Sequence, residues 1–173
     1  MRKIRGRTIT MKAMALAVAM LAVSPAAADG TTGLELSTKK PIRLDQPAII
    51  QVQITNNSSQ SLEFGSTVGT VEADFSVSLL RADGGTVSKT DYGRALAGQY
   101  SGPDDPAQNY SSSGGSYETI RLMPGETLAE RINLSKIFQI DRRGRYKVQI
   151  ERRFSDDPSA EAARSNTLFF SVQ

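Results

Sequence analysis

Residues 144–150 read Gly-Arg-Tyr-Lys-Val-Gln-Ile, and apolar and polar side chains alternate along them. Successive side chains of an extended strand point to opposite faces, so this stretch has one apolar face and one polar face. Such alternation is typical of a strand that covers a core on one side and contacts water on the other. The pattern predicts an inward set of Tyr146, Val148 and Ile150 and an outward set of Arg145, Lys147 and Gln149.

The same period-two pattern recurs along the rest of the chain, and turn signals separate its occurrences. Pro124-Gly125 has the proline and glycine of a type II turn, and Asp83-Gly84-Gly85 suggests a hairpin. Beyond residue 28, no long window has the 3.6-residue apolar period of a helix. Short strands at turn spacing predict an all-β fold, a sandwich or a barrel of about 7–9 strands with one long loop. Further core residues expected from the alternation are Phe75, Val77, Leu168 and Phe170.

Two single positions add detail to this prediction. Glu130 lies on the same strand face as Leu128 and Ile132, and it is the one charged mismatch there. Tyr146 follows the turn at Asp141–Gly144, where a buried tyrosine can donate its hydroxyl to the backbone a few residues upstream. Immunoglobulin-like domains use this tyrosine corner, so we expect a structural role for Tyr146.

Residues 1–28 have the three parts of a secretory signal peptide: a basic start, an apolar stretch at 13–23, and Ala26-Ala27-Ala28 before Asp29. As a helix the apolar stretch rises about 16 Å, whereas a bilayer core is about 30 Å thick. We therefore expect cleavage after Ala28 and a single sandwich domain at 29–173. The location expected is periplasmic or secreted, without membrane embedding after cleavage.

The chain of 173 residues has a formal net charge of +3, but the signal region carries five basic and no acidic residues. Residues 29–173 therefore hold 16 basic and 18 acidic side chains, which gives no reason to expect nucleic-acid binding. The sequence contains no Cys and no His. Disulfides, thiol nucleophiles, Ser-His-Asp triads and His metal clusters are thus excluded. We expect a protein that is not an enzyme, with no catalytic, cofactor-binding or metal site.

The C-terminal half carries four segments that together resemble a known family. They are Leu122–Glu126, Ile132–Phe138, Gly144–Val148 and Ser165–Leu168. They resemble the immunoglobulin-like sandwich that precedes the catalytic domain of deuterolysin-type zinc metallopeptidases. The chain is also similar, more loosely, to the intracellular proteinase inhibitor domain. The resemblance covers about residues 74–172 and implies a sandwich alone, because the His-Glu-x-x-His helix of the peptidases is missing.

Two pairs of adjacent acids occur in predicted loops, Asp104-Asp105 and Asp156-Asp157. Catalytic carboxylates must converge across a cleft, whereas neighbours in a loop usually point apart into water. Solvated loop acids are therefore the expected interpretation. Calcium binding by either pair is the alternative, because calcium accepts loop carboxylates and carbonyls.

Six basic residues lie between positions 142 and 153. They can form a patch for an anionic partner, or an ordinary solvated face that discourages pairing between sheet edges. The residues assigned to this candidate basic face are Arg142, Arg143, Arg145 and Lys147.

Residues 91–116 lose the strand pattern and are rich in Gly, Ser and Tyr. Long irregular segments in compact domains are usually functional or disordered. Tyr with Ser and Gly is also the composition that binding loops use. The candidate partner-binding residues are Tyr92, Tyr100 and Tyr110, and a spacer without a partner is the alternative.

These observations predict an exported, non-catalytic binding module. Its expected partner is an unidentified protein or cell-envelope component. An accessory inhibitor of an exported protease is the alternative, although a Gly/Ser-rich loop lacks the rigidity that an inhibitory loop needs. An enzyme with an unfamiliar set of residues is a third possibility.

Overall fold

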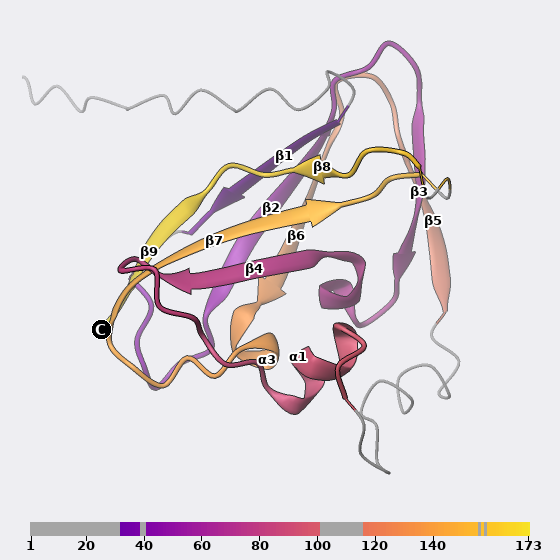
Figure 1. Ribbon diagram of the computed structural model, residues 1–173. Helices are drawn as coiled ribbons and strands as arrows, with labels where there is room; N and C mark the ends of the chain where they lie inside the picture. The colour runs from indigo at the N-terminus through magenta and orange to yellow at the C-terminus, as the bar shows by residue number, and fades with distance from the viewer. Residues whose placement is uncertain (1–31, 39–40, 101–115, 156, 158) are drawn as a thin grey trace, which may run out of the picture.

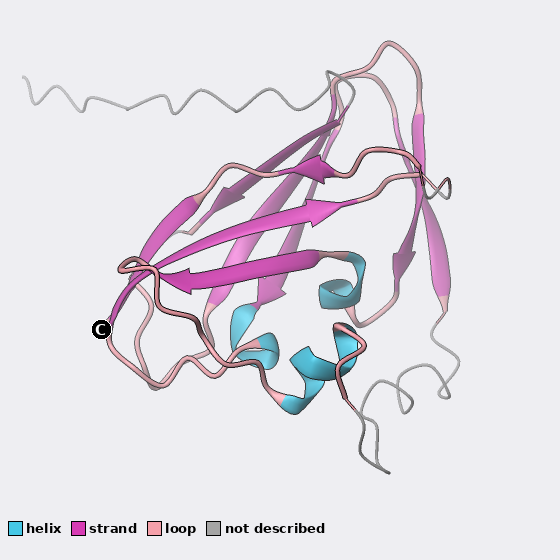
Figure 2. Ribbon diagram, in the orientation of Figure 1, coloured by secondary structure: helices cyan, strands magenta, loops and turns pink. Residues whose placement is uncertain are grey.

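The computed structural model describes residues 32–38, 41–100, 116–155, 157 and 159–173. Within this part the fold is an all-β, immunoglobulin-like antiparallel sandwich with three short helical segments (Figures 1 and 2). The strands are β1 (Thr32–Ser37), β2 (Ile49–Asn56), β3 (Leu62–Thr67), β4 (Ser76–Arg81), β5 (Tyr117–Leu122), β6 (Thr127–Asn133), β7 (Gly144–Arg152), β8 (Ala163–Arg164) and β9 (Leu168–Val172). The helical segments are η1 (Val71–Asp74), α1 (Asp91–Leu96) and α3 (Leu134–Ile137).

Two layers enclose the core. One layer is the sheet β1-β2-β6, and in the other layer β7 pairs with β4, β8 and β9, while β3 and β5 form a separate two-stranded sheet. In Figure 1 the β4–β7 sheet passes in front of β1, β2 and β6. The N-terminal part of the domain contacts both layers, because β1 pairs with β2 and Ile42, beyond the end of β1, forms a parallel bridge with Val172 of β9. This crossing closes one side of the sandwich.

The ladders β2–β6 and β3–β5 meet at two adjacent turns, which Asn56 joins. Its side-chain amide donates to the carbonyl oxygens of Gln60 and Leu122 at 2.8 and 2.9 Å. Its backbone carbonyl accepts from Gly125 at 2.8 Å, within the expected type II turn. Gly125 has a φ of 80°, as the third position of that turn requires. The predicted turn is therefore confirmed.

The alternation in residues 145–150 is confirmed for the inward set. Tyr146, Val148 and Ile150 are buried, and the Tyr146 hydroxyl donates to the carbonyl oxygen of Arg142 at 2.6 Å. The predicted tyrosine corner is therefore present, and the ring stacks on Phe170 with 5.6 Å between centroids.

The other expected core residues follow the prediction closely. Phe75 and Phe170 are buried, whereas Val77 and Leu168 pack against the core but stay half-buried. Val77 is open on one side because it lines a groove beside α1, and Leu168 is the first residue of its strand. On the outward face Arg145 is exposed, and Lys147 and Gln149 are half-buried.

The expectation of an irregular segment at 91–116 is wrong at its start, where α1 forms. Thr90 caps this helix, because its side-chain oxygen accepts from the backbone N–H of Gly93 at 3.0 Å. Gly93 lies against the Ile137 carbonyl of α3 so closely that a Cβ atom would overlap it. The helix is too short to show a 3.6-residue period, so tertiary packing determines it. In the described ranges, no helix is long and apolar enough to cross a bilayer.

Candidate binding surfaces

Glu130 of β6 and Arg152 of β7 form a buried ion pair between the two layers. Nη1 of Arg152 lies 3.4 Å from Oε2 of Glu130, and Nη2 lies 3.3 Å from Oδ2 of Asp74. The side chains of Arg152 and Glu130 are 3% and 9% exposed. The charged mismatch in the β6 pattern is thus explained, because Arg152 continues the inward series of β7 and brings a cation to Glu130.

Three aromatic rings surround the guanidinium group. The Arg152 Cζ atom lies 4.7 Å from the Phe64 ring centroid, 4.9 Å from that of Phe75 and 5.3 Å from that of Phe154. Phe64 and Phe154 also meet edge to face. A guanidinium group is weakly hydrated and stacks well on aromatic faces. An arginine is therefore better suited to this position than a lysine.

Burial dominates the electrostatics of this pair. It raises the pKa of Glu130, and the Arg152 charge opposes that shift only in part. Burial likewise lowers the pKa of Arg152, against the attraction of Asp74 and Glu130. Because the two carboxylates and the guanidinium satisfy one another, this cluster acts as a structural joint between the layers.

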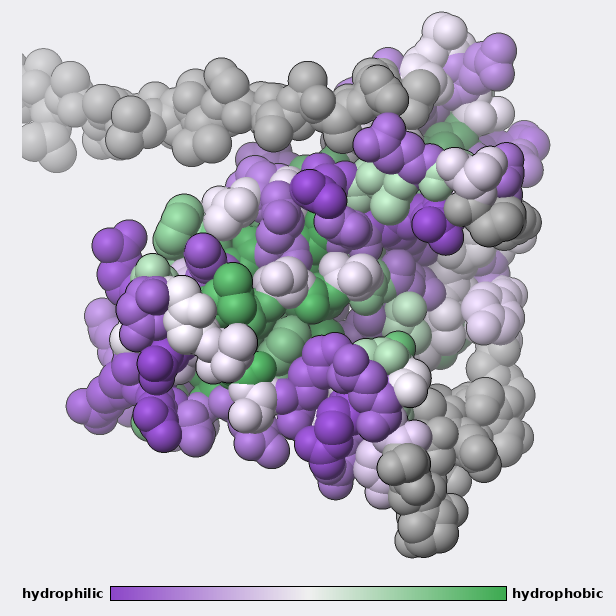
Figure 3. Space-filling view, in the orientation of Figure 1, coloured by the Kyte–Doolittle hydropathy of each residue, from purple (hydrophilic) through white to green (hydrophobic). Residues whose placement is uncertain are grey.

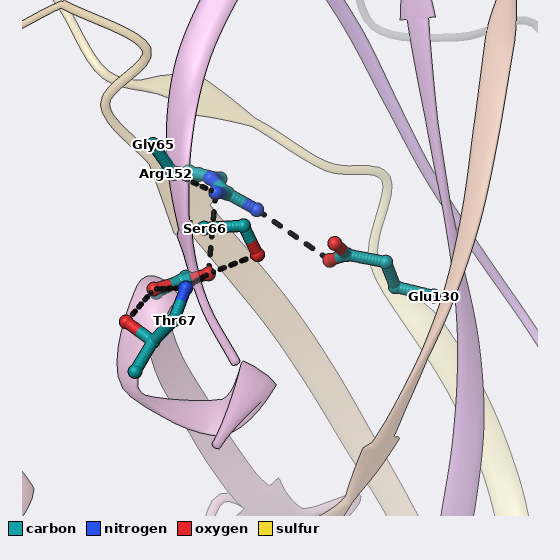
Figure 4. Close-up of polar contacts among 6 residues, drawn as sticks. Gly65, Ser66, Thr67, Glu130 and Arg152 are labelled. Carbon is teal, nitrogen blue, oxygen red and sulfur yellow. Dashed lines mark hydrogen bonds and ion pairs between the residues drawn. The ribbon is translucent and has the colours of Figure 1, made fainter. Parts of the chain in front are cut away.

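The joint also closes the outer edge of β3 (Figure 4). Nη2 of Arg152 donates to the Gly65 carbonyl oxygen at 2.8 Å, and Asp74 accepts from the Thr67 backbone N–H at 3.1 Å. Asp74 also accepts from the hydroxyls of Ser66 and Thr67. Side chains therefore occupy the backbone groups that another strand would use.

A groove of about 490 Å³ lies where α1 and α3 meet the ends of β4 and β7. Val77, Leu96 and Ile137 provide apolar lining, and Lys89 and Arg153 provide cations. The acids at the groove are already paired within the described residues: Asp74 with Arg152, and Glu151 with Arg164 at 2.7 Å.

The two cations are engaged less strongly. Lys89 Nζ lies 3.4 Å from the side-chain oxygen of Gln99, and Nε of Arg153 donates to the Ala160 carbonyl at 3.1 Å. No acid in the described ranges lies within ion-pair distance of either residue. Asp157 is near enough that Arg153 contributes to lowering its pKa, after the hydrogen bonds from Ser159. The groove thus combines an apolar lining with positive charge.

The predicted tyrosines have different environments. Tyr92 of α1 is half-buried and packs against the core. Tyr100 is half-buried at the C-terminal side of α1, and Tyr110 lies outside the described residues. Tyr92 therefore has a structural contact as well as its predicted binding role, and that role stays a prediction. Sequence analysis missed Lys89 and counted Arg153 only as a member of the basic run at 142–153, because the two residues are far apart in the chain and share no pattern.

The four residues of the candidate basic face lie on β7 and in the turn before it, but they are not equally exposed. Arg142 and Arg143 are exposed in the turn before β7, and Arg145 is exposed on that strand beside the half-buried Lys147. Arg152 belonged to the same basic run but is buried in the joint, so it does not contribute to this face. Figure 3 shows hydrophobic surface over the middle of the β4–β7 sheet with hydrophilic side chains around it.

The calcium alternative concerns residues that are mostly outside the described ranges, namely Asp104, Asp105 and Asp156. Asp157 is exposed and accepts hydrogen bonds from the backbone and hydroxyl of Ser159 at 2.8 and 2.7 Å. Where the chain is described, no three side chains of the His, Cys, Asp or Glu types are grouped so that they could hold a metal ion.

Known proteins resemble this chain in structure rather than in sequence. No family model matches the chain, and no curated protein matches it. Among solved structures, the ASH/PapD-like domain of human CEP192 (PapD-like domain 7) is similar, with 13% identity and a TM-score of 0.30. The match covers 92% of this chain and 94% of that domain.

Proposed function

We propose that the protein is an exported, non-catalytic binding module whose partner docks in the groove beside α1. The observation that carries this proposal is the groove itself, because apolar side chains line one depression together with two cations that form no ion pair with any described acid. Apolar lining with a few charged groups is the usual composition of a recognition site. The partner is accordingly a protein segment that presents an acidic side chain beside an apolar one.

Export is part of the same proposal and rests on the signal-like residues 1–28. The resemblance of residues 74–172 to the non-catalytic sandwich of deuterolysin-type metallopeptidases stays an expectation from the sequence, and it agrees with a binding role. Nothing in the described ranges favours the protease-inhibitor alternative. That Tyr100 and Tyr110 contribute to binding stays a prediction.

Site-specific photo-cross-linking tests the proposal. A photoreactive residue replaces Ala97, which is exposed and lines the groove, and a control replaces the exposed Gln53 on β2. We expect a covalent adduct from position 97 and none from position 53. The adduct is expected to disappear when Lys89→Glu and Arg153→Glu are combined. An adduct from position 53 alone, or one that persists after charge reversal, would contradict the proposed site. Intact mass of the exported form tests export, with a chain beginning at Asp29 expected.

A further inference from the structure

The strand β5 has one free edge in the described part of the chain, where its pairing is with β3 alone. Gly65 and Thr67 direct backbone groups away from β5, toward Arg152 and Asp74. Their register partners Thr119 and Tyr117 therefore direct backbone groups away from β3, as alternation in an antiparallel ladder requires. No hydrogen bond between described residues reaches these outward groups.

Three of the other strand edges, those of β1, β3 and β6, are bonded by side chains or contact a helical segment. The outer edge of β1 is bonded by the side-chain amide of Asn166, which accepts from the Leu36 N–H at 2.7 Å and donates to its carbonyl. Arg152 and Asp74 bond the outer edge of β3, and at the end of β6 the Glu72 side chain of η1 accepts from the Asn133 N–H at 3.3 Å. The β3–β5 sheet lies on the right in Figure 1. A free, regular strand edge is a template for pairing with another chain.

We infer that β5 pairs antiparallel with β5 of a second copy of this chain, centred on Thr119. Odd-numbered and even-numbered residues of β5 face opposite sides of the sheet. A two-fold axis perpendicular to the sheet does not exchange these faces, so odd-numbered residues can lie opposite only odd-numbered ones. In the register centred on Thr119, Tyr117 of each copy lies opposite Arg121 of the other. This arrangement places a cation beside an aromatic ring twice, once on each side of the axis.

The chemistry of the strand supports this occupant. Tyr117 is 79% exposed, which is unusual for a large aromatic side chain and leaves its ring available to a partner. Arg121 pairs with Glu63 across β3–β5, so its guanidinium is held on the same face as Tyr117 and Thr119. Thr119, between Tyr117 and Arg121 on the same face, is exposed as well, so all three side chains are accessible to an added strand.

Charge variants at the axis test the pairing. Thr119→Lys places two ammonium groups opposite each other, and Thr119→Glu places two carboxylates there. By sedimentation equilibrium we expect the wild-type chain to reach twice the monomer mass at high concentration, and each variant alone to remain monomeric. An equimolar mixture of the two variants is expected to restore the dimer. Ser78→Lys, an exposed position on β4, is the control and should dimerise like wild type.

Because the chain has no Cys, a second experiment tests the register. Paired residues at a hydrogen-bonded antiparallel position have Cα atoms about 5.5 Å apart, within the range of a disulfide. Thr119→Cys should therefore oxidise to a covalent dimer many times faster than Glu118→Cys. A wild-type chain that stays monomeric at every soluble concentration overturns the inference. A dimer that forms equally well in both charge variants, or equal oxidation at positions 118 and 119, overturns it as well.

Discussion

The guanidinium of Arg152 lies 3.4 Å from the carboxylate of Glu130, and the two residues belong to opposite layers of the sandwich. Asp74 completes the cluster from η1, and the three Phe rings exclude water around it. Since the same guanidinium also bonds the edge of β3, one side chain links β3, β6, β7 and η1.

Arg152→Met should destabilise the fold strongly, because it leaves Asp74 and Glu130 buried without a cation. Removing one member of a buried pair costs about 3–5 kcal/mol. Urea unfolding measures the loss. The control is Arg164→Met, which breaks the exposed pair with Glu151 and should cost about 0–1 kcal/mol. Similar losses in the two variants would show that the Arg152 cluster has no special role.

The pH dependence of stability should contain a contribution from Glu130. Burial raises the folded-state pKa of this group above its ordinary value of 4.5. The folded state then binds this proton more tightly than the unfolded state does. Protonation of Glu130 therefore adds to the free energy of unfolding below pH 4.5, and this gain is lost as the pH rises through the folded-state pKa. Asp74 and Glu118 raise the pKa further, and Arg152 lowers it.

Glu130→Gln replaces the titrating carboxyl group with a neutral amide that does not titrate. The free energy of unfolding of wild type should therefore fall relative to that of the variant as the pH rises above 4.5. Chemical denaturation at a series of pH values measures the difference. A difference that is constant with pH, or that changes in the opposite direction, would contradict the raised pKa.

Gly93→Ala should be destabilising, because a Cβ atom would overlap the Ile137 carbonyl where α1 crosses α3. Overpacking of this kind costs about 1–3 kcal/mol. Gly65→Ala is the matched control, since nothing lies within 4 Å of the atom it would add. Thermal unfolding compares the two variants. Equal unfolding midpoints would mean that α1 and α3 can move apart to accommodate the added methyl group without loss of stability.

Tyr92→Ser and Tyr100→Ser should have different effects on stability. Full burial of a large apolar side chain contributes about 1.5–3 kcal/mol, and Tyr92 is half-buried against the core, so about 1–2 kcal/mol should be lost there. Tyr100 is not among the residues that pack on the core, and its replacement should leave the midpoint nearly unchanged. The reverse order would place Tyr100, rather than Tyr92, in the packed part of the domain.

Local patterns in the sequence predicted much of the sandwich. Alternation identified the inward face of β7, and the Pro-Gly and Asp-to-Gly signals marked turns that the structure contains. The Glu130 mismatch was visible as an anomaly, but its partner Arg152 was grouped with an exposed basic run because sequence distance hides pairing between layers. The groove was not predictable for the same reason, since Lys89 and Arg153 are brought together only by tertiary packing.

The binding role of the α1 groove is tested most directly by the dissociation constant of the cross-linked partner. Three chains of matched thermal stability are compared: wild type, Lys89→Glu with Arg153→Glu, and Arg145→Glu with Lys147→Glu. The account predicts that reversing the groove charges weakens binding at least tenfold, about 1.4 kcal/mol, while the β7 face variant binds like wild type. Unchanged affinity in the groove variant, with weakened binding in the β7 face variant, would contradict it and assign recognition to the basic face.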